Sequence, residues 1–206
     1  MNKEINTRII NLGSIIKRVG TGLNPRKNFV LNTTNSNIPY ITIKNIKNHS
    51  ILHDSDLIDN EALCKINNRS KIENDDILFT SLIPIGNTYM VNNYNNDYAI
   101  NESVFIIKPN KSKMHPMFLY LTLQMNYIKI QALKEASGSI QKSLKLENLL
   151  AIKVKVPSNN KIIDNFVDIN YPLFQSWQSI EHKVKDLKTL RDFLLPLLLN
   201  EQVIIK

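Results

Sequence analysis

Residues 166–199 read FVDINYPLFQSWQSIEHKVKDLKTLRDFLLPLLL, and this stretch decides how the chain is organised. Its apolar residues recur at alternating steps of four and three, which is the spacing of a heptad seam along one face of a helix. The seam consists of Phe166, Asn170, Leu173, Trp177, Ile180, Val184, Leu187, Arg191 and Leu194. Most residues between these positions are charged or polar, so we predict an amphipathic helix that needs a partner.

The sequence upstream of Ser158 contains no second long amphipathic pattern. We therefore expect the partner of this helix in another chain or another protein, with packing on its own domain as the alternative. Two prolines interrupt the pattern. Pro172 is expected to split or bend the helix near Tyr171, and Pro196 is expected to end or kink it near Leu195.

Length and composition favour a globular domain with a helical appendage. The chain has 206 residues, of which 43% are hydrophobic and 21% are charged, as in globular proteins. We expect an α+β fold, with a mixed α/β domain over residues 1–157 and a coiled-coil-type helix with a short tail over 158–206. No segment has the pattern of a signal peptide or a membrane span, so the expected location is the cytoplasm. The single Cys64 allows neither an internal disulfide nor a cysteine-rich zinc site.

Charge is distributed in blocks along the chain, whose formal net charge is +8. The segment up to His53 is strongly basic, residues 54–102 are acidic, and residues 103–161 are basic again. This order suits a fold that brings the two basic blocks to one face for a polyanion. A solvated, lysine-rich surface is the alternative interpretation.

Local patterns in the first 157 residues predict mainly strands. Strands are expected at 39–43, 77–79, 88–91, 103–107 and 152–156, and residues 7–19 are expected to form a strand that leads into a short helix. Residues 116–133 have the pattern of one helix with Pro116 in its first turn.

Motifs for catalysis are missing from the sequence, which has no phosphate-binding loop, dinucleotide fingerprint or nucleophile elbow. Only His49 and His53 have the spacing of helical metal ligands, and they fall in a stretch with turn and strand character. Asp75 and Asp76 follow Asn74 and are better explained as a turn than as a carboxylate pair. A small metal-dependent nuclease and a coiled-coil adaptor remain alternatives to DNA binding without catalysis.

Four stretches resemble the DNA-specificity subunit of Type I restriction-modification systems. They are residues 12–16 with Gly20-Thr-Gly22 and 38–45; residues 72–79 with Ile85-Gly86; residues 136–141 ahead of 149–157; and residues 190–196 with 200–203. The usual subunit of this family has two target-recognition domains and two helices, whereas this chain has one of each. It also carries Asn200-Glu201 where the family often has a glycine.

The resemblance implies sequence-specific binding of double-stranded DNA by a chain that is not an enzyme. Lysine and arginine side chains would neutralise phosphates, and polar side chains on loops would reach base edges. The expected DNA contacts are Lys17, Arg18, Thr21, Lys44, Asn45, Lys47, Ser81, Asn87, Ser139, Gln141 and Lys142. No cofactor or metal is expected in this chain. S-adenosylmethionine, ATP and magnesium would belong to a methyltransferase subunit and a restriction subunit that join it.

A chain with half of the usual parts would recover the family's arrangement as a homodimer. The expected dimer interface consists of Trp177, Ile180, Val184, Leu187 and Leu194. A two-fold protein reads a two-fold site, so the expected target is an interrupted palindrome. A truncated remnant is the alternative to a functional half-subunit.

Overall fold

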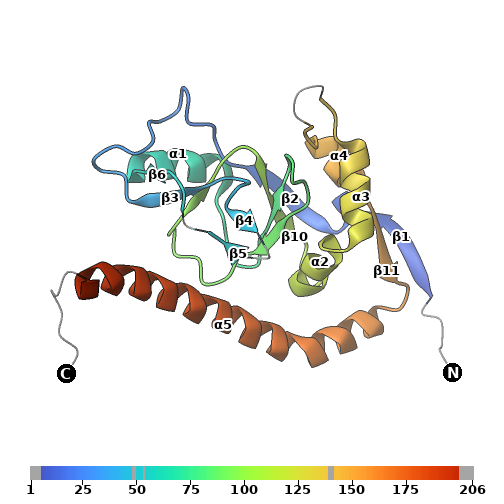
Figure 1. Ribbon diagram of the computed structural model, residues 1–206. Helices are drawn as coiled ribbons and strands as arrows, with labels where there is room; N and C mark the ends of the chain where they lie inside the picture. The colour runs from blue at the N-terminus through green and yellow to red at the C-terminus, as the bar shows by residue number, and fades with distance from the viewer. Residues whose placement is uncertain (1–5, 48–49, 53, 139–141, 200–206) are drawn as a thin grey trace. The chain divides into compact units, whose positions relative to one another are not determined.

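The computed structural model describes residues 6–47, 50–52, 54–138 and 142–199 (Figure 1). The chain divides into two units, Met1–Val167 and Asp168–Lys206. The first unit is a mixed α+β domain with several small sheets, and the second consists mainly of helix, which confirms the predicted fold class.

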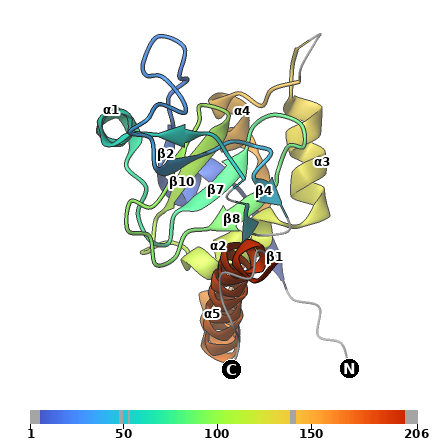
Figure 2. The same cartoon turned by 60° about the vertical axis from the view of Figure 1, so that its left-hand side comes forward.

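A four-stranded antiparallel sheet lies at the centre of the first unit, in the order β2-β10-β7-β8 (Figure 2). Its strands are β2 (Ile16–Thr21), β7 (Ile77–Thr80), β8 (Thr88–Met90) and β10 (Val104–Pro109). All four residues of β7 are buried, because this strand is internal and both of its faces are covered. Leu78, Val104 and Ile106 enter the main apolar core together with residues from β3 and β9.

Short strands extend the domain on either side of this sheet. A three-stranded sheet has the order β6-β3-β9, built from β3 (Ile38–Ile41), β6 (Leu57–Ile58) and β9 (Ala99–Ile100). Two-stranded sheets are formed by β4 (Ile46–Lys47) with β5 (Ser50–Ile51), and by β1 (Thr7–Asn11) with β11 (Lys153–Pro157). The predicted strand at the start of the chain is confirmed, but a single 3-10 turn, η1 (Leu12–Ser14), and then β2 follow it in place of the predicted helix.

Helix α1 (Asn60–Ser70) was not predicted from the sequence. Asp59 caps its N-terminus, because its Oδ1 accepts a hydrogen bond of 2.8 Å from the backbone N–H of Ala62. Ala62, Leu63 and Ile66 bury one face of the helix in a second apolar cluster with Tyr40 and Ile58. Asp59 at the cap and the spacing of the buried residues are the sequence signals from which this helix can be predicted.

The helix predicted over residues 116–133 is two helices, α2 (Pro116–Leu123) and α3 (Asn126–Glu135). Met125 separates them, because its backbone is extended, with φ of −63° and ψ of 140°. A short helix, α4 (Leu146–Ala151), precedes β11.

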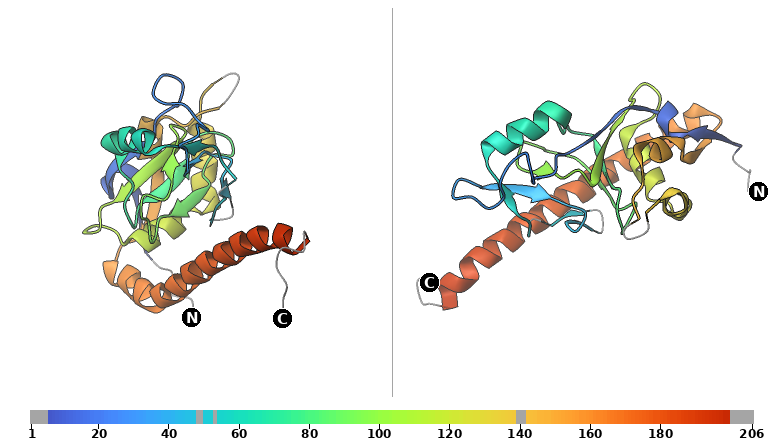
Figure 3. Two further views of the ribbon diagram at one scale, coloured as in Figure 1. Left: turned by 90° about the vertical axis from the view of Figure 1, so that its left-hand side faces the viewer. Right: turned by 90° about the horizontal axis from the view of Figure 1, so that it is seen from above.

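The C-terminal helix α5 (Asn160–Leu199) has 40 residues and is continuous, as Figure 3 shows. Neither Pro172 nor Pro196 ends or splits it. A proline removes only one N–H donor from the helical ladder, and the hydroxyl of Ser176 adds a 2.9 Å hydrogen bond to the Pro172 carbonyl. The start of α5 belongs to the first unit, where the ring of Phe166 lies edge-on to that of Phe118, with centroids 5.7 Å apart. Among the described residues, no helix is long and apolar enough to cross a membrane.

Candidate nucleic-acid interface

The first group of predicted contacts lies on β2, which is an edge strand of the central sheet. Lys17 and Arg18 are exposed, and Thr21 is half-buried. Arg69, in the last turn of α1, donates a 3.2 Å hydrogen bond to the Thr21 hydroxyl, and its own carbonyl accepts one of 3.2 Å from Arg18. The structure therefore adds Arg69 to this group, because α1 brings it beside β2.

Close backbone approach at two glycines makes this arrangement possible. A Cβ on Gly20 would lie 1.6 Å from the Ser70 hydroxyl, and a Cβ on Gly22 would lie 1.7 Å from the Ile100 carbonyl oxygen. No side chain fits at either position without movement of these neighbours. Gly20 thus allows β2 to pass directly against the end of α1, and Gly22, the residue after β2, allows the chain to pass directly against β9.

The second group lies in residues 42–47, which comprise the turn after β3 together with β4 and are called here the β3–β4 turn. Lys44 and Lys47 are exposed, whereas Asn45 is buried, with 5% of its surface exposed. The side-chain oxygen of Asn45 accepts hydrogen bonds of 2.9 Å from both the backbone N–H and the hydroxyl of Thr42, and its amide donates to the Asp54 carbonyl at 2.8 Å. Asn45 holds the turn that presents the two lysines.

The third group follows β7. The Ser81 hydroxyl is buried and donates to the Ser103 carbonyl at 2.8 Å. The Asn87 amide donates to the Ile46 carbonyl at 3.0 Å and so ties this loop to β4, one residue before Lys47. The side chains of Ser81 and Asn87 therefore stabilise the loops that carry neighbouring cations.

The fourth group lies before α4. Ser139 and Gln141 are outside the described residues, and Lys142 is exposed. Ser137 and Ser143 pair through two backbone hydrogen bonds of 3.1 and 2.9 Å, and the N–H of Leu144 donates to the Ser81 carbonyl at 2.8 Å. Ser143 and Leu144, which follow Lys142 in the chain, therefore lie against the segment around Ser81.

A further loop, residues 23–37, carries the exposed Arg26 and Lys27 and projects from the domain (Figure 1). Tyr40 holds its base by donating its hydroxyl proton to the Leu23 carbonyl. Burial, with a contribution from nearby Glu102, raises the pKa of Tyr40, so the hydroxyl stays protonated as a donor. The basic pair was not among the predicted contacts.

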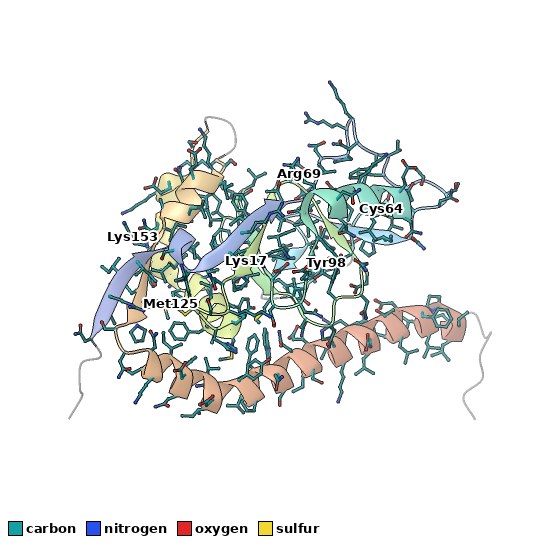
Figure 4. All side chains as sticks on the ribbon, turned by 180° about the vertical axis from the view of Figure 1, so that it is seen from behind. Lys17, Cys64, Arg69, Tyr98, Met125 and Lys153 are labelled. Atoms are coloured by element: carbon teal, nitrogen blue, oxygen red, sulfur yellow. The ribbon has the colours of Figure 1, made fainter. Side chains whose placement is uncertain are left out.

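Basic residues also follow β1 and β2 across one face. Seen from behind, Lys153 of β11, Lys17 of β2 and Arg69 of α1 follow one another in this order (Figure 4). Within the part of the chain that the structure describes, the ion pairs involve none of Lys17, Lys44, Lys47 and Lys142. Exposed cations without carboxylate partners are suited to neutralise phosphates.

The acidic segment, by contrast, is largely engaged within the domain. Lys108 Nζ lies 2.8 Å from Asp76 Oδ2 and 3.0 Å from Glu73 Oε2, and Lys111 Nζ lies 2.6 Å from Asp75 Oδ2. A hydrogen bond from Lys108 lowers the pKa of Glu73, whereas burial raises the pKa of Asp76 despite the same lysine. These three carboxylates thus have lysine partners within the domain, of which only Asp76 is buried.

Metal-ligating groups do not gather in threes among the residues that the structure covers. His49 and His53 lie outside the described residues, and His182 lies on α5 between Glu181 and Lys183.

The model of the Type I restriction modification DNA specificity domain matches residues 5–185. The chain belongs to this family. The match covers most of the chain, including all but the first four residues of the first unit and more than half of α5. The resemblance found in the sequence is thereby confirmed.

Solved structures share the fold of this specificity domain. The S subunit of the Type I restriction-modification system from M. genitalium superposes with a TM-score of 0.60 at 11% identity, over 93% of this chain and 45% of that one. The HsdS subunit from Thermoanaerobacter tengcongensis gives 0.53 at 13% identity, over 96% and 46%. A chain from a study of assembly and conformational transition of the type I R-M system gives 0.52 at 14% identity, over 91% and 45%. A search of curated protein sequences found no match. The specificity domain thus spans about half the length of the solved structures that it resembles.

Proposed function

We propose that this specificity domain directs a Type I restriction-modification complex to its DNA target by reading one half of a split site. The observation that carries this proposal is the family match over residues 5–185, together with the exposed cations on β2 and on the β3–β4 turn. Lys17, Arg18, Lys44, Lys47 and Lys142 would contact phosphates. Base reading would fall to polar side chains on the adjoining loops, for which Thr21, Ser139 and Gln141 stay predictions.

Asn45, Ser81 and Asn87 enter the proposal in a different way. Their polar groups are engaged by the main chain: Asn45 bonds within its own turn, Ser81 bonds the Ser103 carbonyl and Asn87 bonds the Ile46 carbonyl. Each of them supports the proposed interface by fixing the loop from which an exposed neighbour reaches DNA. Their assignment to direct base contact stays a prediction.

The second part of the proposal is a homodimer through α5. The side chains of Ile180, Val184 and Leu187 are 58%, 41% and 64% exposed, while Trp177 and Leu194 are half-buried. Burying such a seam between two chains contributes roughly 1.5 to 3 kcal/mol for each large side chain, before the cost of association. Two copies would then supply the two recognition domains that a full-length subunit carries in one chain.

Partner subunits would supply the chemistry. By its family, the chain would join a methyltransferase subunit that uses S-adenosylmethionine, and an ATP-dependent restriction subunit that needs magnesium, in the cytoplasm. The specificity domain itself would bind none of these cofactors. A mixture of the isolated chain with DNA and all of them is expected to show neither methylation nor cleavage.

Selection of bound duplexes from a random library by the full chain tests the proposal. The expected enriched sequence is an interrupted palindrome, because a two-fold protein presents two identical reading surfaces. Enrichment of a single uninterrupted or asymmetric site would overturn the homodimer. No enrichment of any sequence would overturn recognition by this chain and favour a truncated remnant.

A further inference from the structure

The two outer edges of the β1–β11 ribbon differ in how their backbone groups are hydrogen-bonded. On β11, the side chain of Gln131 bonds both backbone groups of Lys153, at 3.0 Å each. The Tyr127 hydroxyl accepts the N–H of Lys155 at 3.2 Å, and Pro157 has no N–H to satisfy. Helix α3 therefore closes this edge with side chains, as proteins do to prevent unwanted strand pairing.

The edge of β1 is left open among the described residues. Two backbone hydrogen bonds of 2.9 Å show which residue pairs of the β1–β11 ladder are bonded. The N–H of Leu12 donates to the Ile152 carbonyl, and the N–H of Ser158 donates to the Asn6 carbonyl. In an antiparallel ladder, residue pairs that are hydrogen-bonded alternate with pairs that are not. The backbone N–H and C=O groups of the even-numbered residues of β1 therefore point toward β11. The backbone groups of Thr7 and Ile9 consequently point away from β11, along the free edge.

The side chains around this edge are apolar and basic. Ile9 is 62% exposed and lies opposite Lys155 in the register, on the face of the ribbon away from the buried Val154 and Val156. Lys153 lies on the same face and donates to the Asn11 side chain at 2.7 Å. Arg8, on the other face, is also exposed. Neither strand carries an acidic residue.

We infer that β1 is a docking edge for an extended segment of another protein in which acidic and apolar residues alternate. The segment would add a strand to the ribbon through the N–H and C=O groups of Thr7 and Ile9, a mode of recognition in which the main chain supplies affinity. An apolar residue opposite Ile9 would cover it, and the carboxylates, on the other face of the added strand, would face Arg8.

Charge and chemistry distinguish this occupant from others. A second copy of β1 would place like charges close together across the new pairing, which is unfavourable. Duplex DNA would satisfy the lysines but would leave the exposed Ile9 and the peptide edge unmatched. The inference is independent of the DNA-reading role proposed above, because Thr7, Arg8 and Ile9 are not among the residues proposed there to contact DNA.

Amide exchange in the free, isotope-labelled full chain is the first test. The N–H groups of Thr7 and Ile9 are expected to exchange at least about tenfold faster than those of Arg8 and Ile10, which are bonded to β11. Equal protection of all four amides would show that the edge is already occupied and would overturn the inference.

The second test is binding of a synthetic peptide, acetyl-Glu-Val-Glu-Ile-Glu-Val-Glu-amide, followed through the same amides. Protection of Thr7 and Ile9 is expected, with affinity at least about tenfold above that of the same peptide with lysine in place of glutamate. No protection, equal binding of both peptides, or protection by a duplex oligonucleotide instead would each overturn the inference.

Variants at Ile9 separate edge pairing from simple apolar contact. Ile9→Pro removes the outward N–H without touching a bond to β11, and proline is tolerated on edge strands. We expect it to weaken the acidic peptide about tenfold, and Ile9→Thr, which keeps the N–H, to weaken it about threefold. Equal binding by all three proteins would contradict strand addition. If Ile9→Pro fails to fold, the exchange data and Ile9→Thr still decide the question.

Discussion

Lys108 Nζ lies 2.8 Å from Asp76 Oδ2, and the two side chains are only 18% and 5% exposed, so this ion pair joins β10 to the start of β7 inside the domain. Burial raises the pKa of Asp76 above its ordinary value of 3.8, while Lys108 lowers the pKa of Glu73 below 4.5. Removing the lysine would leave a buried carboxylate without its counter-charge.

Lys108→Met is therefore expected to lower the free energy of unfolding by about 3 kcal/mol near neutral pH. The loss should shrink at about pH 4. The raised pKa of Asp76 lets it become protonated and neutral as pH falls. The stabilisation from Glu73, present above its ordinary pKa, is lost as pH falls through its lowered pKa. Chemical denaturation at both pH values measures this difference.

The matched control is Lys111→Met, which removes an exposed ion pair: the side chains of Lys111 and Asp75 are 63% and 37% exposed. Its expected loss in the free energy of unfolding is less than about 1 kcal/mol. Equal losses at the two pH values would contradict the role of Asp76.

Gly22→Ala is expected to destabilise the domain more than Gly20→Ala. The added methyl group of Gly22→Ala would meet the backbone of β9, which cannot move without breaking its pairing with β3, whereas that of Gly20→Ala would meet the side chain of Ser70. We expect a loss of about 3 kcal/mol or more for Gly22→Ala and about 1 to 3 kcal/mol for Gly20→Ala. The double variant Gly20→Ala with Ser70→Gly should recover part of the second loss, as measured by thermal unfolding. No recovery would show that Ser70 is not the obstacle.

Asn45→Ala is expected to lower the free energy of unfolding by about 2 kcal/mol, because it leaves the Thr42 N–H and hydroxyl and the Asp54 carbonyl without their buried partner. Lys44→Ala and Lys47→Ala, which truncate exposed neighbours, should each change it by less than about 0.5 kcal/mol. Urea denaturation of the three variants provides the comparison. If Asn45→Ala leaves stability unchanged while altering sequence preference, its main role is in reading bases.

Charge reversal at the β3–β4 turn is expected to weaken DNA binding for all sequences. The double variant Lys44→Glu with Lys47→Glu should lower the slope of log affinity against log salt by about 0.9 for each lost phosphate contact. Fluorescence anisotropy over a salt series measures this slope. Lys65→Glu on α1 serves as the control, because Lys65 is already paired with Glu61 at 2.7 Å. An unchanged slope in the double variant would place the DNA contacts elsewhere on the domain.

Charged substitutions in the seam of α5 are expected to abolish dimer formation. The double variant Ile180→Asp with Leu187→Asp would place carboxylates where the apolar side chains of the two chains should meet. Each substitution loses an apolar contact of roughly 1.5 to 3 kcal/mol, and burying the unpaired carboxylate adds a further cost in the free energy of association. The control is Gln175→Asp with Ser179→Asp, which adds the same charge off the seam of the same helix. Light scattering at micromolar concentrations should show a monomer for the first variant and a dimer for the second. A monomeric natural chain under the same conditions would contradict the proposed homodimer.

Several helices and strands of the fold could be predicted from local sequence patterns. The heptad spacing from Phe166 to Leu194 predicted a long amphipathic helix, and α5 extends through it. Alternation in residues 152–156 predicted the strand that forms β11, and the buried run near Ile77 predicted β7. These predictions succeeded because helix and strand periodicity depend on residues a few positions apart.

The residues that form the candidate DNA interface could not be predicted in full, because their exposure depends on packing between residues far apart in the sequence. Asn45 and Lys44 are neighbours in the chain, yet one is buried and the other exposed, because only the closed turn decides which side chain faces inward. Arg69 joins Arg18 and Thr21 because α1 ends against β2. The open edge of β1 exists because β1 pairs with β11, and Asn11 lies 142 positions from Lys153 in the sequence. Thus the sequence by itself determined the periodic elements and the balance of charge. Only the tertiary structure decided which polar groups are satisfied internally and which remain free, because burial and strand edges are properties of the assembled domain.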